Sequence, residues 1–280
     1  MSPARSLRRA AAERLREAGV ASPERDADEL LAHVLGTTLG RLPLVEAIAD
    51  ADAVTYDALV ARRAAREPLQ HLLGTAAFRH VELAVGPGVF VPRPETELLA
   101  GWAVEQAAPL ERPVVVDLCT GSGAIARAVA DEVPHARVHA VELDDAAHRW
   151  AVRNLAGTGV DLRQGDMADA FDELAGTVDV VVCNPPYIPL DAWESVAPEA
   201  RDHDPHLALF SGDDGLVAMR VLERRAALLL RPGGVVGAEH ADVQGASAPG
   251  VFSAAGRWAE VRDHTDLAGR ARYLTARLAR

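Results

Sequence analysis

Residues 114–133 read VVVDLCTGSGAIARAVADEV. The apolar run at the start is typical of a buried strand, and the alanine-rich run at the end is typical of a helix. Between them, Gly121 and Gly123 permit a tight turn and let a ligand approach the backbone closely. This strand, glycine turn and helix predict an α/β domain that binds a nucleotide-like ligand at the carboxyl end of the strand.

Acidic residues follow at places where such sheets hold a nucleoside. Glu142 ends the next predicted strand, and an acid about 20 residues beyond the turn accepts hydrogen bonds from ribose hydroxyls in nucleotide-binding sheets. Asp166 and Met167 follow the third predicted strand, where Met167 would pack on an adenine and Asp166 would accept from its amino group. A plain loop acid and a core methionine are the alternative for this pair. Asp117 either meets the ligand's amino group or caps the turn.

A second motif, Asn184-Pro185-Pro186-Tyr187, directly follows the apolar run 178–183. The prolines lack the N–H groups that a sheet requires and fix their own φ, so the strand ends here. We expect residues 184–187, called the lip below, to be rigid and extended, and to present a carboxamide, two carbonyls and an aromatic face. Such groups hold a planar amide or amine nitrogen with its lone pair toward an electrophile. The lip therefore predicts alkylation of a weakly nucleophilic nitrogen beside a methyl donor.

A ligand with a ribose and no phosphate fits these residues, and S-adenosyl-L-methionine, whose product is S-adenosyl-L-homocysteine, is such a ligand. The residues that we expect to bind it are Asp117, Cys119, Thr120, Gly121, Ser122, Gly123, Glu142, Asp166, Met167 and Asn184. Cys119 and Cys183 both end predicted strands. We expect both to lie at the ligand's crevice as small, buried side chains with reducible thiols, since neither has an evident partner base.

The N-terminal quarter of the chain has a different pattern. Apolar residues recur at spacings of three and four in residues 4–67, which predicts three to five short helices. Alternation in residues 78–91 predicts a β-hairpin. We expect a helical substrate-binding domain, a β-hairpin linker and an α/β domain, over residues 1–75, 76–92 and 93–280.

The α/β domain alternates between runs typical of strands and runs typical of helices. The predicted strands are 114–118, 137–143, 161–164, 178–183, 235–239, 258–263 and 272–276. The predicted helices include 123–133, 146–156, 215–230 and 241–255. Such alternation predicts a largely parallel sheet with helices on both faces. The last two strands are close in sequence, so we expect them to pair antiparallel.

Composition argues against several classes of protein. No apolar stretch approaches the ~20 residues of a membrane span, and the arginine-rich N-terminus lacks the apolar core of an export signal, so we expect a cytoplasmic protein. Two cysteines are too few for a disulfide framework. We expect no metal site, because His203 and His206 would supply at most half of a zinc site. The net charge of −12 arises in residues 81–280, with 18 arginines against 30 acidic residues, which argues against direct nucleic-acid binding.

Together these motifs resemble the HemK/PrmC family, the peptide chain release factor glutamine methyltransferases. The resemblance rests on the segment 117–124, on Glu142 and on the lip. Three further stretches are similar to the family: EPLQHLLG at 67–74, FVPRPETE at 90–97 and DPHLALFSGDDGL at 204–216. The similarity covers nearly the whole chain, although residues 188–203 match poorly.

The resemblance implies a class I methyltransferase: a Rossmann-like, seven-stranded and mostly parallel sheet behind a small helical N-terminal domain. It implies that the substrate is the glutamine of the Gly-Gly-Gln (GGQ) motif in release factors. Cys119 stands where the family often has glycine, and Met167 where an aromatic residue is common; both differences bear on cofactor affinity. The alternatives are a ribosomal-protein glutamine methyltransferase, an adenine-specific nucleic-acid methyltransferase acting on a flipped base, and a non-catalytic binding module.

The lip suggests how an amide could react. An amide nitrogen is barely nucleophilic because its lone pair is delocalised into the carbonyl. We expect the Asn184 side-chain oxygen and the Pro185 carbonyl to accept the two N–H groups of the target glutamine. Tyr187 would stack on the amide plane, and Pro186 would stiffen the lip. These four residues are the predicted catalytic and substrate-binding residues.

Overall fold

The computed structural model describes residues 2–279, which divide into two compact units. The first, called the helical unit, contains the described residues up to Thr75 together with Ala197–His203. The second, called the sheet unit, contains Ala76–Val196 and the described residues from Asp204 onward. Within residues 2–279, no helix is both long enough and apolar enough to cross a membrane.

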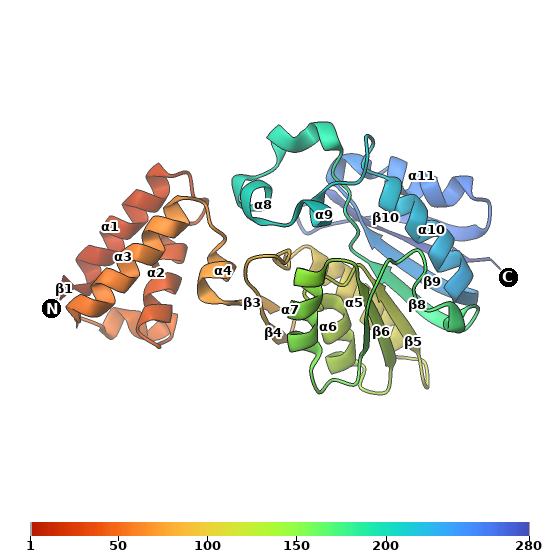
Figure 1. Cartoon of the computed structure of the whole chain (residues 1–280), viewed down its shortest axis with the longest axis horizontal. Coiled ribbons are helices and arrows are strands. Elements are labelled where there is room, and N and C mark those ends of the chain that lie inside the picture. Colours follow the sequence, from red (N-terminus) through yellow and green to blue (C-terminus); the bar gives the residue numbers. More distant parts are fainter. Residues whose placement is uncertain (1, 280) are drawn as a thin grey trace. The chain divides into compact units, whose positions relative to one another are not determined.

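The helical unit is built on a bundle of α1 (Ala4–Glu17), α2 (Pro23–Val34) and α3 (Asp50–Ala64) (Figure 1). Its smaller elements are β1 (Ser2–Pro3), η1 (Leu39–Leu44), β2 (Ala47–Ile48), α4 (Leu69–Leu73) and α8 (Pro198–His203). Apolar residues spaced by three and four meet in one core, where Leu15, Leu30 and Leu31 are fully buried. The predicted helical N-terminal domain is confirmed.

One helix of this unit comes from far along the chain. α8 carries Glu199, which accepts hydrogen bonds from Arg63 Nη2 at 3.0 Å and from Arg66 Nη2 at 2.7 Å. Arg63 also donates from Nε to Asp26 at 2.8 Å. Burial alone would raise the pKa of Glu199, but the hydrogen bonds from Arg66 and Arg63 outweigh it and lower that pKa to about 2. An ion-pair network therefore fastens α8 to the helical bundle.

The sheet unit is organised around seven strands in the order β10-β11-β9-β8-β5-β6-β7. They are β5 (Val114–Leu118), β6 (Arg137–Glu142), β7 (Asp161–Gln164), β8 (Val178–Cys183), β9 (Leu230–Glu239), β10 (Trp258–Thr265) and β11 (Ala271–Leu278). The first five in chain order pair parallel. β11 is antiparallel to β9, and β10 to β11. The predicted seven-stranded, mostly parallel sheet is confirmed.

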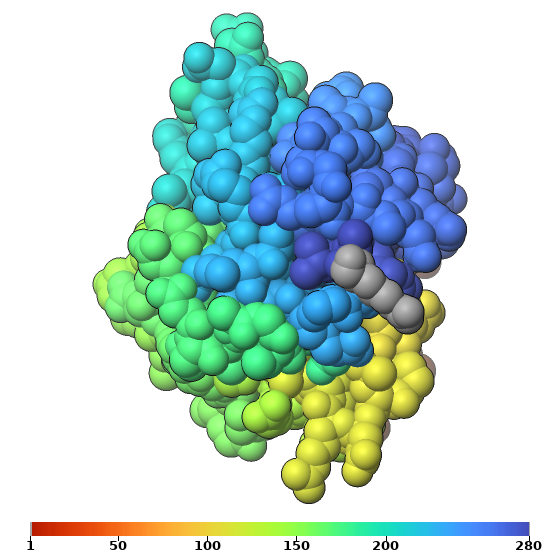
Figure 2. Space-filling view, turned by 90° about the vertical axis from the view of Figure 1, so that its right-hand side faces the viewer, coloured from red at the N-terminus to blue at the C-terminus, as the bar shows by residue number. Residues whose placement is uncertain are grey.

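Helices cover both faces of this sheet, as Figure 1 shows. One face carries α5 (Thr96–Ala107), α6 (Ala124–Glu132) and α7 (Asp145–Leu155), and the other carries α10 (Val217–Leu229) and α11 (Ser247–Ala254). Side chains alternate along a strand, so Val115 packs into one core while Val114 and Val116 pack into the other. Figure 2 shows the C-terminal segments, in dark blue, beside the lighter blue segment of α10. The uninterrupted run of valines in β5 follows from burial on both faces.

Shorter elements connect the layers. They are β3 (Thr75–Phe78), β4 (Val81–Ala84), η2 (Asp172–Leu174), η3 (Leu190–Ser195), α9 (His206–Leu209) and η4 (Asp242–Gln244). β3 and β4 form a two-stranded sheet. The continuous helix predicted over 241–255 was wrong, because the chain breaks between η4 and α11. Gly245 lies there so close to β11 that an added Cβ would be 2.8 Å from Ala271 Cβ. β9 also begins at Leu230, five residues before the predicted strand.

Candidate active site

Strand register brings the glycine turn, residues 119–123, beside the lip. On β5, Leu118 pairs with Cys183 of β8 and with Val141 of β6. The chain therefore leaves the sheet at residues 119, 142 and 184 along one edge, with β5 in the middle. The carboxyl ends of parallel strands lie at a common edge of the sheet. The sequence alone does not determine that β8, and not β7, pairs with β5. This edge is where open α/β sheets bind their ligands.

A cavity of about 400 Å³ opens at this edge, which is a usual size for a small-molecule site. The predicted cofactor-binding residues that line it are Cys119, Thr120, Gly121, Ser122, Glu142, Asp166, Met167 and Asn184. Asp117 and Gly123 lie behind the lining. In the lip, Asn184, Pro186 and Tyr187 line the cavity, whereas Pro185 is buried outside it. One cavity thus brings together the two motifs that the sequence separates by 60 residues.

The glycine turn requires left-handed backbone at three positions. Gly121 and Gly123 have φ of 58° and 86°. At Gly123 a Cβ would also lie 3.0 Å from Leu155 Cγ, so both conformation and space demand glycine. Cys119 has φ of 63°, where a side chain is sterically unfavourable. This strain gives a physical reason why glycine would suit position 119.

Glu142 is tied to the turn that it faces. Gly121 N–H donates to its Oε2 at 2.8 Å, and Asp144 N–H donates to its Oε1 at 2.8 Å. Burial raises the pKa of Glu142, and these backbone hydrogen bonds counteract the rise. Each carboxylate oxygen has a second lone pair, so Glu142 retains acceptor capacity on the cavity wall.

Asp117 supports the turn from below. Its Oδ2 accepts from Thr120 Oγ1 at 2.6 Å and from Ala126 N at 3.1 Å. Its Oδ1 is buried and, among the described residues, has no hydrogen-bond partner. Burial raises the pKa of Asp117 to about 7, although the two hydrogen bonds oppose the rise. One carboxylate oxygen thus caps the turn, and the other is an unused acceptor directly behind the cavity.

Sulfur atoms and a leucine form the wall on the β6 and β7 side. Met167 is 8% exposed, and its Sδ lies 3.6 Å from Cys119 Sγ. Leu143 lines the same wall and is half exposed, although no sequence signal identified it. Asp166 accepts from Ala168 N at 2.8 Å, which caps the loop after β7. Cys183 is fully buried, as expected, but the expectation that it lines the cavity was wrong, because its place in the β8 alternation directs it into the core under α10.

The lip is held in place by the segments around it. Gln244 Nε2 donates to the Tyr187 carbonyl at 2.9 Å, and Ile188 N–H donates to the Leu209 carbonyl at 2.8 Å. Gly215 lies so near that an added Cβ would be 2.3 Å from the Tyr187 carbonyl. The outer end of the lip is therefore held by a side-chain hydrogen bond from Gln244 and by close packing against Gly215.

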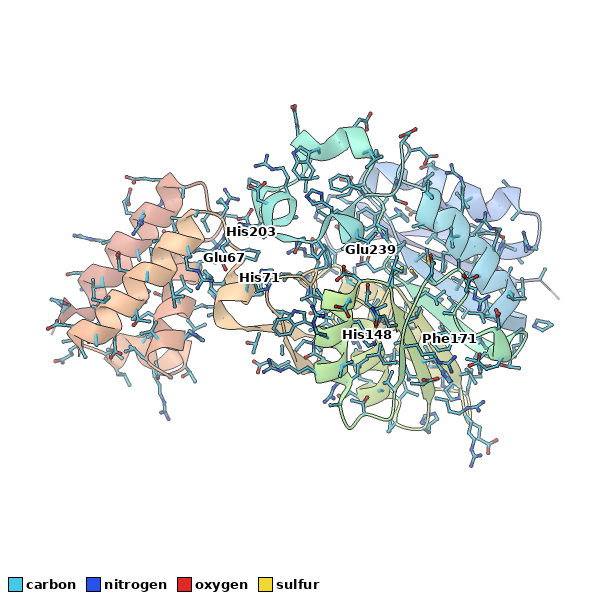
Figure 3. All side chains as sticks on the ribbon, viewed as in Figure 1. Glu67, His71, His148, Phe171, His203 and Glu239 are labelled. Carbon is cyan, nitrogen blue, oxygen red and sulfur yellow. The ribbon has the colours of Figure 1, made fainter. Side chains whose placement is uncertain are left out.

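Two buried residues that the sequence did not identify contact the lip. Asn184 Nδ2 donates to Thr96 Oγ1 at 3.3 Å, and Tyr187 Oη donates to Glu239 Oε1 at 3.2 Å. Thr96 Oγ1 donates in turn to Glu239 Oε2 at 2.7 Å. Glu239, labelled in Figure 3, ends β9 and is 1% exposed. The available signal was an acid at the carboxyl end of a predicted parallel strand, the same signal that identified Glu142.

The segment 204–212, called the strap below, forms the remaining wall. Its first residue, Asp204, accepts from Arg93 Nη2 at 2.5 Å, and its carboxylate is fully buried. Burial raises the pKa of Asp204 to about 6 in spite of the Arg93 charge. Trp193 stacks on Phe210 of the strap, with ring centroids 5.5 Å apart. The ion pair gives a structural reason why the segments 90–97 and 204–216 occur together in one chain.

Models of two protein families match this chain. The PrmC N-terminal domain matches residues 6–74, and the methyltransferase small domain matches residues 94–198. Together these matches cover most of both units. They agree with a helical domain followed by a methyltransferase domain.

Curated proteins match over longer stretches. A release factor glutamine methyltransferase of Streptomyces coelicolor is 59% identical over 271 residues, which cover 96% of each chain. One of Mycolicibacterium smegmatis is 48% identical over 283 residues, which cover all of both chains. A 4-amino-L-phenylalanine/4-methylamino-L-phenylalanine methyltransferase of Streptomyces pristinaespiralis is 50% identical over 204 residues, or 71% of this chain and 70% of that one.

Proposed function

We propose, since the chain belongs to the family of release factor glutamine methyltransferases, that it transfers a methyl group from S-adenosyl-L-methionine to the side-chain amide nitrogen of the GGQ glutamine in peptide chain release factors. The observation that carries this proposal is one cavity with two walls. A glycine turn with the acid Glu142 forms one wall, and the carboxamide of Asn184 forms another.

The residues present fit the proposed methyl donor. Glu142 offers acceptor capacity to the hydroxyls of a ribose, and Met167 with Leu143 gives a polarisable, apolar surface to a base. The unpartnered Oδ1 of Asp117 is an acceptor that an amino group would satisfy. When bound, S-adenosylmethionine supplies an electrophilic methyl group on a positively charged sulfur. The product would leave as S-adenosyl-L-homocysteine.

The chain's own task is to hold an amide nitrogen that scarcely reacts in water. Asn184 Oδ1, on the cavity wall, would accept one N–H group of the glutamine. The carbonyl of Pro185, a residue that does not itself line the cavity, would accept the other if the bound amide reaches the end of the lip. This draws electron density toward the nitrogen and directs its lone pair into the cavity. Tyr187 supplies a flat face on the same wall, and Pro186 limits movement of the lip. Positioning of this kind can recover ~7–11 kcal/mol of a barrier.

The alternative functions differ from the proposed one in the substrate that is methylated. A ribosomal-protein glutamine presents the same amide, so the lip does not distinguish it from a release factor. An adenine in nucleic acid presents a similar amine, but residues 81–280 hold 18 arginines against 30 acidic residues. The relative from S. pristinaespiralis is named for an aromatic amine, another nitrogen conjugated to a planar group. That relative supports a site for flat nitrogen groups and adds a small-molecule candidate to the test.

A methylation assay with isotope-labelled methyl donor tests the proposal. The substrates are a release factor, its GGQ variant with alanine for glutamine, ribosomal proteins, DNA and 4-amino-L-phenylalanine. We expect label in the release factor alone, and only when its glutamine is intact. Preferential label in any other substrate would replace the proposal. Calorimetric titration that detects no S-adenosylmethionine binding would instead favour a non-catalytic module.

Substitution of the lip carboxamide tests the roles within the site. We expect Asn184→Ala to lower kcat by at least about 100-fold, as the loss of a preorganised polar group in an active site commonly does. The melting temperature should change little, and kcat should fall by more than the affinity for S-adenosylmethionine, because Asn184 is also one of the expected cofactor-binding residues. Gln106→Ala, which removes a partly exposed carboxamide from α5 outside the cavity, is the matched control. Near-normal turnover by Asn184→Ala would refute the assignment.

A further inference from the structure

We propose that Thr96 and Glu239 are positioning residues that fix which end of the Asn184 carboxamide faces the substrate. This inference rests on the proposed function, because it concerns the acceptor offered to the target amide. It adds a polar chain behind the lip, which runs from the end of β9 through the first turn of α5 to the end of β8. The four lip residues alone do not fix the orientation of the Asn184 carboxamide; the hydrogen bonds of Thr96 and Glu239 do.

The direction of each hydrogen bond follows from what each atom can do. The Glu239 carboxylate only accepts, and it takes hydrogen bonds from Thr96 Oγ1 at 2.7 Å and from Tyr187 Oη at 3.2 Å. A threonine hydroxyl has one hydrogen, which is thereby committed to Glu239. Toward Asn184, 3.3 Å away, Thr96 Oγ1 can therefore only accept. The Asn184 group that faces Thr96 must be its NH₂.

The opposite orientation is penalised on both sides of the carboxamide. If Asn184 turned over, its Oδ1 would face the Thr96 oxygen with no hydrogen between two acceptors. Its NH₂ would at the same time face the N–H groups of the incoming glutamine. A flipped carboxamide thus loses one internal hydrogen bond and the hydrogen bond to substrate. The chain behind the lip selects the orientation in which Oδ1 is free to accept.

Burial of Thr96 and Glu239 favours a fixed geometry for the hydrogen-bonded chain behind the lip. Thr96 is 4% exposed and Glu239 is 1% exposed, so water does not compete for their hydrogen bonds. Burial raises the pKa of Glu239 above its ordinary value, and the hydrogen bonds from Thr96 and Tyr187 and the charge of Arg272 limit that rise. These three groups favour the carboxylate form that the chain requires. Because Glu239 also accepts from Tyr187, one carboxylate aligns two residues of the lip.

Thr96→Val and Thr96→Ser test the hydrogen-bonded chain, because the two variants differ in whether residue 96 carries a hydroxyl. Valine keeps the shape and removes the hydroxyl, and serine restores it. We expect Thr96→Val to lower kcat about 10- to 100-fold, as small errors of alignment do, with the affinity for S-adenosylmethionine within about threefold of wild type. Thr96→Ser should recover most of kcat. Thr275→Val is the control, because Thr275 is also buried, at 8% exposure, and lies outside the cavity.

Asparagine labelling gives a readout that does not depend on any substrate. The chain has only two asparagines, Asn154 and Asn184, so ¹⁵N-asparagine labelling yields two side-chain NH₂ signals in an NMR spectrum. We expect the Asn184 protons to exchange slowly in the wild type. In Thr96→Val they should shift and exchange faster, while the Asn154 signal stays in place. A release factor that goes unmethylated would sink the proposed function, but it would leave this spectrum unchanged.

The second variant changes the carboxylate of Glu239. Glu239→Gln replaces one acceptor with an NH₂ donor, so either Thr96 or Tyr187 loses its partner, and kcat should fall with a smaller change in KM. Glu223→Gln is its control, since Glu223 is a buried acid that accepts from Trp258 Nε1 away from the cavity. Wild-type kcat in Thr96→Val together with an unmoved Asn184 signal would overturn the inference. So would a loss that Thr96→Ser fails to restore.

Discussion

At the scale of single residues, the least expected feature is a cysteine in left-handed backbone. Cys119 has φ of 63° at the point where β5 passes into the glycine turn. A side chain there costs roughly 1–2 kcal/mol. The thiol recovers part of this cost by its contact with Met167 in the cavity wall.

Because of this positive φ, we expect position 119 to accept glycine but not a β-branched residue. We expect Cys119→Gly to change the free energy of unfolding by less than about 1 kcal/mol, since lost strain offsets lost packing and gained chain entropy. Cys119→Val should destabilise by about 2 kcal/mol, because a β-branched residue rarely adopts positive φ. Urea unfolding measures both. A valine variant as stable as the glycine variant would contradict the strain at this position.

Asp117 gives a prediction for pH. Its folded-state pKa is raised to about 7, above the ordinary value of about 3.9. The stabilisation linked to its proton is therefore complete below about pH 4 and lost as the pH rises through about 7. From this group alone, the free energy of unfolding should fall by about 1.4 kcal/mol per pH unit between those limits. Asp117→Asn should lack that slope, so the wild-type curve minus the variant curve isolates it. A flat difference between pH 5 and 7 would contradict the buried, protonated state.

At the scale of elements, α8 depends on a single acid. Glu199 joins this helix to Arg63 and Arg66 of the helical bundle. Its pKa is lowered to about 2, so the stabilisation that it contributes is present above about pH 4.5 and lost as the pH falls toward 2. α8 is thus joined to the bundle by ion pairs of one acidic side chain.

Removal of that charge should release α8 and leave the bundle folded. We expect Glu199→Gln to cost roughly 1–3 kcal/mol of local stability and to speed amide hydrogen exchange in residues 197–203. Exchange in α1 and α2 should not change, since their core does not include Glu199. Glu194→Gln, at an exposed position of η3, is the control for loss of a negative charge nearby. Unchanged protection of 197–203 would mean that other contacts hold α8.

At the scale of the whole molecule, two units have separate cores. The cavity is lined entirely by residues of the sheet unit. A ligand that binds there stabilises the folded state of that unit.

Calorimetry with S-adenosyl-L-homocysteine tests this separation. At 100 times its dissociation constant, the ligand should stabilise the sheet unit by about 2.7 kcal/mol. We expect a second transition, that of the helical unit, to stay at the same temperature. Glu142→Ala should weaken the response, since it removes the proposed ribose acceptor. A single transition that moves as a whole with ligand would show that the units unfold together.

Much of the fold followed from patterns that are local in the sequence. β5 and β8 were predicted from apolar runs because their valines are buried on both faces of the sheet and leave no polar alternation. The prediction of one helix over 241–255 failed because the chain forms η4 and α11 with a break at residues 245 and 246. Gly245 lies against Ala271 of β11 at this break, and the local sequence pattern does not contain that contact. Cys183 was misplaced for a related reason: its side of the sheet is set by the register of β8.

Three features of the cavity wall are local in the sequence: a glycine turn, an acid at the end of the next strand, and a proline-rich end to a fourth strand. These are short-range features, because φ preferences and missing N–H groups act within a few residues. Only the tertiary structure decided that β5 lies between β6 and β8, and that Thr96 and Glu239 meet behind Asn184. Their contacts span 88 and 143 positions of the chain, and no local preference encodes a hydrogen bond whose partners meet only when α5 packs on the sheet.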